Sequence, residues 1–199
     1  MRPVLYVPAE SSRSRAVAQK KLMRKEYAKA VRKEFCARFE KALPQFELSN
    51  DKESAGSGAR LYELVVSDNL ALYICLGMSR NFEEFIVEIA WSEQRRFPSS
   101  YLALEPEPKN GEIFRHLPRL WNKSNYSWWV VEPRDSLEEI KRRFREFDFE
   151  RPPAELYLPR IPALVEDAVS KIIEYAVPYF EKVAAEHGYE INLREPSVQ

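Results

Sequence analysis

The sequence predicts an α+β domain, in which an antiparallel sheet of about four strands has long N-terminal and C-terminal helices packed on one face. Apolar residues recur every three or four positions in residues 28–46 and again in residues 165–183, which is the helical period. Between these segments, residues 61–91 hold three short runs rich in β-branched and aromatic residues. The turns between the runs are too short for crossover helices, so the strands are expected to be antiparallel.

The first helix is predicted by an apolar stripe that ends near a proline, Pro44. Its members are Ala28, Val31, Phe35, Phe39, Ala42 and Phe46. Because the stripe begins only near Ala28, we assign residues 1–22 to an N-terminal extension and 23–188 to a single α+β domain, with 189–199 as a C-terminal tail. Met23 is an alternative start of translation.

Strands are expected at residues 61–66, 70–76 and 85–91, the first two joined by a tight turn at 67–69. In the third strand, Glu84 and Glu88 share a face that we expect to be mostly solvated. The opposite face should enter the core with both helices. The expected core comprises Leu64, Leu72, Ile74, Val87, Ile89 and Trp91 from the sheet, and Phe35, Phe39, Ile172 and Ile173 from the helices.

Two adjacent tryptophans, Trp128 and Trp129, lie in a further apolar run. Neighbouring side chains on a strand point to opposite faces, so the two rings cannot form one stacking surface. One ring should be buried in the hydrophobic core. The other should cover a second surface, where it either packs or contacts a partner.

Two helices are expected after this run. Ser136 and Glu139 fit a capping box, and the buried face that follows would hold Leu137, Ile140, Phe144 and Phe147. The last helix should begin near Pro162, kink at Pro178 and end at the pair His187 and Gly188. Residues 113–121 are expected to form a short helical turn within a proline-punctuated loop.

Composition indicates a globular chain: 45% of the residues are hydrophobic, and 31 basic residues balance 31 acidic ones. Cys36 and Cys75 lack metal spacing and are interpreted as buried thiols of a reducing compartment. No segment has the length and apolarity of a membrane span, and we expect a cytoplasmic protein.

The sequence contains few candidates for catalytic or metal-binding residues. The only histidines are His116 and His187, which lack ligand neighbours at zinc spacing. Residues four apart on a strand are separated by about 13 Å, which is too far for Glu84 and Glu88 to act as a retaining carboxylate pair. We therefore predict no catalytic residues, no metal and no cofactor, and His116 is the best remaining candidate for a general base.

Charge is the strongest signal for binding. Between Arg13 and Lys41 there are eleven basic and three acidic residues, an excess of eight that the rest of the chain offsets. Lys25, Lys29, Arg32 and Lys33 are expected on the exposed face of this helix. Such a face can be a solvated surface, contact an acidic protein, or bind nucleic acid.

Four short segments resemble an uncharacterised bacterial α+β domain family of unknown function. They are "LYICLGM" ending at Met78, "IAWS" from Ile89, "WWVVEPRDSLEEI" from Trp128 and "YAVPYFEKV" from Tyr175. Some members of that family are associated with toxin–immunity or defence neighbourhoods, which implies a non-enzymatic binding role. The extension before Met23 and the proline-rich insertion near Pro106 depart from the family's compact pattern.

The sequence thus favours a non-catalytic interaction protein, such as an immunity-type or defence-associated protein, that binds a protein partner. The site residues proposed are Lys25, Lys29, Arg32, Lys33, Trp128 and Trp129. The alternative is a nucleic-acid-associated module that uses the basic N-terminal helix.

Overall fold

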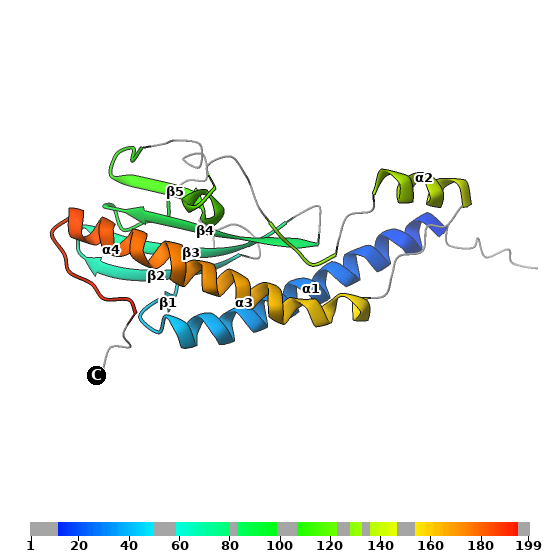
Figure 1. Ribbon diagram of the computed structural model, residues 1–199, viewed down its shortest axis with the longest axis horizontal. Helices are drawn as coiled ribbons and strands as arrows, with labels where there is room; N and C mark the ends of the chain where they lie inside the picture. Colours follow the sequence, from blue (N-terminus) through cyan, green and yellow to red (C-terminus); the bar gives the residue numbers. More distant parts are fainter. Residues whose placement is uncertain are drawn as a thin grey trace, which may run out of the picture.

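A computed structural model (Figure 1) describes residues 12–49, 59–79, 83–98, 107–122, 128–132, 136–146 and 154–194. The helices are α1 (Ser12–Ala42), α2 (Leu137–Glu146), α3 (Ile161–Lys171) and α4 (Val177–Glu186). The strands are β1 (Glu47–Leu48), β2 (Arg60–Ser67), β3 (Leu70–Met78), β4 (Glu84–Ser92), β5 (Glu112–His116) and β6 (Trp129–Val130). Short 3₁₀ turns are η2 (Leu117–Leu120), η3 (Ala154–Leu156) and η4 (Leu158–Arg160), and η5 (Ile172–Ala176) is a π-helical turn.

The strands form one antiparallel sheet of order β1-β2-β3-β4-β5, with β6 also paired to β4. Strand β4 is long enough to pair with two strands along the same edge. Its first residues pair with β6 and its last ones with β5. The sheet therefore has more strands than the four expected: β6 lies in the run around Trp128 and Trp129, where the fourth was expected, and the additional strands are β1 and β5, which are short and carry little alternation in the sequence.

The first and last helices cover one face of the sheet, as predicted. α1 and α3 lie side by side, and α4 continues across the strands (Figure 1). Val31, Phe35 and Phe39 of α1 are fully buried with Val165 and Phe180 of the C-terminal helices. The first turns of α1 project beyond the sheet (Figure 1). The helix begins at Ser12 and runs unbroken through Met23.

One expected core residue of the last helix, Ile173, is 40% exposed, whereas its neighbour Ile172 is fully buried. The two side chains point about 100° apart around the helix axis, and only Ile172 continues the buried row. At this point the Val177 N–H donates to the Ile172 carbonyl, five residues back, which forms the π turn η5. Pro178 has no N–H for an ordinary helical bond, and the wider turn precedes it.

Two further expectations about burial were wrong. The face of β4 with Glu84 and Glu88 is not solvated, because Glu84 is only 4% exposed and a second cluster, which includes Tyr73 and Phe114, covers the sheet there. In α2 the Ser136 hydroxyl accepts a hydrogen bond from the Glu139 N–H, as predicted, but Leu137 is 66% exposed. The side chains of Ile140 and Phe144, and all of Phe147, lie outside the described residues.

The end of α4 has the predicted geometry. Gly188 has φ +84°, the Tyr189 N–H donates to the Ala184 carbonyl, and the Gly188 N–H donates to the Ala185 carbonyl. These two bonds define a Schellman motif, in which a glycine with positive φ ends the helix.

Of the expected core residues in the sheet, Leu64 is only partly buried against the core.

The position of Ile172 and Ile173 makes a paired stability prediction. We expect Ile172→Ala to lower the free energy of unfolding by about 2–5 kcal/mol, because it leaves a cavity in the core. The matched variant Ile173→Ala should cost at most about 1 kcal/mol, since its side chain already contacts solvent. Urea denaturation measures both, and equal losses would contradict the helix phase described here.

Candidate functional site

The outer face of α1 carries an exposed row of cations, which we call the lysine row: Lys25, Lys29 and Lys33. Their spacing of four residues places successive lysines about 6 Å apart along one side of the helix. The buried row on the opposite side includes Tyr27, and this burial fixes the direction in which the lysines point. Among the described residues, no carboxylate forms an ion pair with any lysine of the row.

The carboxyl-terminal half of α1 is neutralised, unlike the half with the lysine row. Arg38 pairs with Glu34 one turn earlier on the same helix and with Glu166 of α3. The charges of residues 34–42 therefore sum to zero, whereas residues 25–33 carry four basic residues and one acidic residue.

Arg32 does not belong to the exposed row, although its sequence position suggested that it would. Its side chain is half-buried beside Arg60, the first residue of β2. Burial lowers the pKa of Arg32, and the charge of Arg60 lowers it further. We call Arg32 and Arg60 the arginine pair.

A polar contact ties α1 to β2 next to the arginine pair. The Tyr62 hydroxyl lies 3.0 Å from the Cys36 sulfur and 3.1 Å from a Glu40 carboxylate oxygen. Burial, followed by these two neighbours, raises the pKa of Tyr62. The hydroxyl therefore stays protonated and can donate to one of these acceptors.

The two tryptophans have different environments. Trp129 is 9% exposed, stacks on Phe85 at 5.5 Å between ring centroids, and donates from Nε1 to an Asp167 carboxylate oxygen at 2.8 Å. It acts as a packing residue that links β6 to α3. Trp128 is half-buried, so it is the ring of the pair that remains available to a second surface.

The opposite face of the sheet carries a row of chemically active side chains, Cys75, Glu88 and His116, which we call the outer-face row. Cys75 pairs in register with Glu88, and Glu88 pairs with His116, so strands β3, β4 and β5 place the three side by side. The His116 Nδ1 lies 3.5 Å from a Glu88 carboxylate oxygen. Sequence reasoning missed this row because it expected a helical turn where β5 forms.

Burial controls the protonation of the outer-face row. It raises the pKa of Glu88 to about 7, an effect that the hydrogen bond from Cys75 partly offsets. Burial and the nearby Arg119 charge lower the pKa of His116 to about 4, and burial raises the pKa of the Cys75 thiol. A thiol held protonated is a poor nucleophile. Glu88 can instead hold a proton near neutral pH beside a neutral imidazole.

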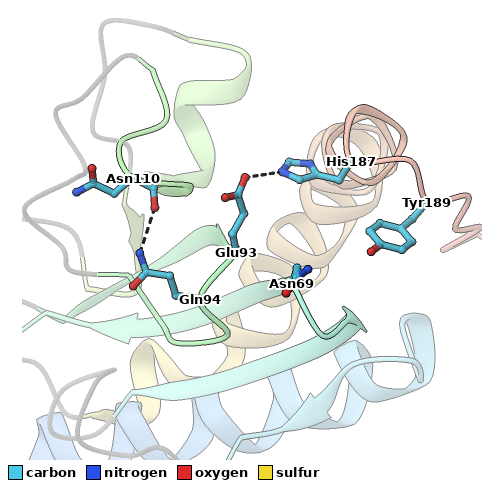
Figure 2. A pocket seen from close by; sticks show the side chains of 6 residues that line it. All are labelled: Asn69, Glu93, Gln94, Asn110, His187 and Tyr189. Atoms are coloured by element: carbon cyan, nitrogen blue, oxygen red, sulfur yellow. Dashed lines mark hydrogen bonds and ion pairs between the residues drawn. The ribbon is translucent and has the colours of Figure 1, made fainter.

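A shallow hollow of about 490 Å³ lies at the end of α4, lined by polar residues of two strand turns and the C-terminal segment (Figure 2). Its wall is held by His187, which contacts Glu93 through Nε2 at 3.0 Å and the Val183 carbonyl through Nδ1 at 2.7 Å. Across the hollow, the Gln94 amide donates to the Asn110 carbonyl at 3.2 Å. These bonds are internal: the bond from His187 to Glu93 fastens the helix end to the turn after β4, and the bond from Gln94 to Asn110 joins that turn to the residues before β5.

Within the described ranges, no cluster of three or more histidine, cysteine, aspartate or glutamate side chains has the geometry of a metal site. The helices of the described part are also too short or too polar to cross a membrane. Comparisons of this chain with protein-family models, with curated proteins and with solved structures returned no match. The assignment of function therefore depends on the geometry of the chain itself.

The outer-face row makes a prediction about pH. His116 has a lowered folded-state pKa, so its contribution to stability is lost as pH falls from about 6.5 to about 4. Glu88 has a raised folded-state pKa, so its contribution is present at low pH and is lost as pH rises from about 4.5 to about 7. The two trends oppose each other between these limits.

We therefore expect His116→Gln to become less stable as pH rises from about 4.5 to about 7, by at most about 1.4 kcal/mol per pH unit. Glu88→Gln should show the reverse, with stability rising with pH between about 4 and about 6.5. Denaturant unfolding of the wild type and both variants across this range measures the slopes. Slopes unchanged by both substitutions would contradict this protonation scheme.

Proposed function

We propose that this chain is a non-catalytic interaction protein that binds an acidic protein partner through the lysine row of α1. We further propose that it acts in the bacterial cytoplasm as an immunity-type or defence-associated protein, in line with the family that its sequence resembles. The observation that carries the proposal is the exposed row Lys25, Lys29 and Lys33, which no described carboxylate compensates.

Charge complementarity across an interface increases the association rate and selects the partner. A row of three lysines extends about 12 Å, which is the length of two helical turns and suits a helix or strand that carries repeated acidic residues. Protein interfaces also need apolar contacts. Leu156, which is 58% exposed, lies on η3, and η3 contacts α1.

Nucleic acid is the alternative ligand for the same face. It is less favoured because domains that bind nucleic acid are usually basic overall, whereas this chain has a net charge of zero. Arg32 is also half-buried beside Arg60, so it does not extend the exposed lysine row along which a nucleic-acid backbone would lie.

Fluorescence anisotropy with a labelled glutamate homopeptide of about 20 residues tests the proposal at about 0.15 M salt. We expect Lys25→Glu with Lys29→Glu and Lys33→Glu to weaken binding at least about tenfold, which corresponds to about 1.4 kcal/mol. The control Lys41→Glu with Lys109→Glu and Lys182→Glu makes the same change in net charge at exposed positions elsewhere. It should bind nearly as well as the wild type.

Equal losses in both triple variants would mean that only net charge matters, and this would overturn the proposed interface. A DNA duplex of about 20 base pairs is the second ligand. Tighter binding of the duplex than of the peptide at the same salt, lost in the first variant alone, would make nucleic acid the ligand of this face.

A further inference from the structure

The arginine pair joins the helix and the sheet at one end of the core. Arg60 begins β2, where it pairs in register with Leu76, and it shares a strand face with Tyr62 two residues later. Tyr62 contacts Cys36 of α1, and Arg32 lies one turn before Cys36 on the same side of the helix. The two guanidinium groups consequently lie near each other between α1 and β2, close enough for the charge of Arg60 to lower the pKa of Arg32.

Neither arginine has its hydrogen bonds satisfied. The Nε atoms of Arg32 and Arg60 are both buried, and neither has a hydrogen-bond partner among the described residues. A buried donor without a protein partner is rare in folded proteins, and such a donor commonly binds a water molecule or an ion. Two such donors on like-charged groups at one place favour an ion of the opposite charge.

Other arginines of the chain do find carboxylates. Arg96 donates to both oxygens of Glu112, and Arg142 contacts Glu139 and Glu146. Beside the arginine pair, the carboxylate of Glu40 accepts a hydrogen bond from Tyr62. Glu40 lies eight residues after Arg32, about 12 Å along the helix, so it does not serve as the counter-ion.

We propose that Arg32 and Arg60 form a binding site for an oxyanion, and that a carboxylate of the acidic protein partner supplies it. The guanidinium fork matches the two oxygens of a carboxylate, and it binds phosphate by the same geometry. A bound anion would accept hydrogen bonds from the guanidinium groups and offset the repulsion between the two cations. Only the source of the carboxylate rests on the proposed function, since the site itself rests on the arginine pair.

Thermal unfolding in different sodium salts tests the site without a partner. Inorganic phosphate and acetate, each compared with chloride at equal ionic strength, are the probes. We expect phosphate or acetate to raise the midpoint of wild-type unfolding by about 2–4 °C when the anion exceeds its dissociation constant severalfold. Arg32→Gln and Arg60→Gln should each lose this rise and should still fold in chloride.

The control is Arg38→Gln, which removes a paired arginine of the same helix and should keep the full rise. A rise of the same size in Arg60→Gln and in the wild type would overturn the site, and so would no rise in the wild type with either anion. The triple lysine variant of α1 should keep the rise, so failure of the proposed function and failure of this site give different results.

The source of the oxyanion is tested by binding of the glutamate homopeptide to Arg60→Gln. We expect Arg60→Gln to bind the peptide severalfold more weakly than the wild type does. The control Arg38→Gln should bind it with the affinity of the wild type. An unchanged peptide affinity in Arg60→Gln, together with a phosphate-dependent rise in the unfolding midpoint of the wild type, would show that the partner's carboxylate does not bind at this site. The site would then be assigned to free phosphate.

Discussion

The packing of one row of α1 against the sheet is the interaction on which the rest of the structure depends. Phe35 and Phe39 are fully buried and stack at 5.3 Å, and Phe39 contacts Tyr62 of β2 at 4.5 Å between ring centroids. Burial of this row fixes the rotation of α1 about its axis. The lysine row must then face outward, and Arg32 must lie toward β2, where it meets Arg60. The exposed lysine row and the half-buried arginine pair thus have one cause.

The sheet imposes a second constraint through its register. Pairing of β3, β4 and β5 brings Cys75, Glu88 and His116 together, although 41 positions separate the first from the last in the numbering. Burial then favours the neutral forms of Glu88 and His116. A shift of one residue in register would move Glu88 to the helix-covered face, so the row depends on the apolar side chains that set the register.

The sequence predicted those parts of the fold that have strong periodicity. Local sequence patterns predicted four features: the apolar stripe around Phe35, the central strands, the helix cap at Ser136 and the helix end at Gly188. The pattern did not separate Ile172 from Ile173, because both are apolar and the π turn η5 alters the helical period at this point. It also could not reveal β5, a five-residue strand, and without β5 there was no reason to place His116 beside Glu88. Arg32 has the spacing of an exposed residue, and only the structure shows that it is half-buried near the charge of Arg60.

The central claim is that the lysine row carries positive charge with which no carboxylate of the described residues forms an ion pair. The most direct measurement is the free energy of unfolding of Lys29→Glu at about 10 mM and about 1 M NaCl. Lys29 has a lysine four residues away on each side, so the account predicts a gain of about 0.5–1 kcal/mol at low salt that disappears at high salt. Lys182→Glu, whose lysine lies 3.6 Å from Glu186, should instead lose stability at low salt. A Lys29→Glu variant that is no more stable than the wild type at low salt would contradict the account.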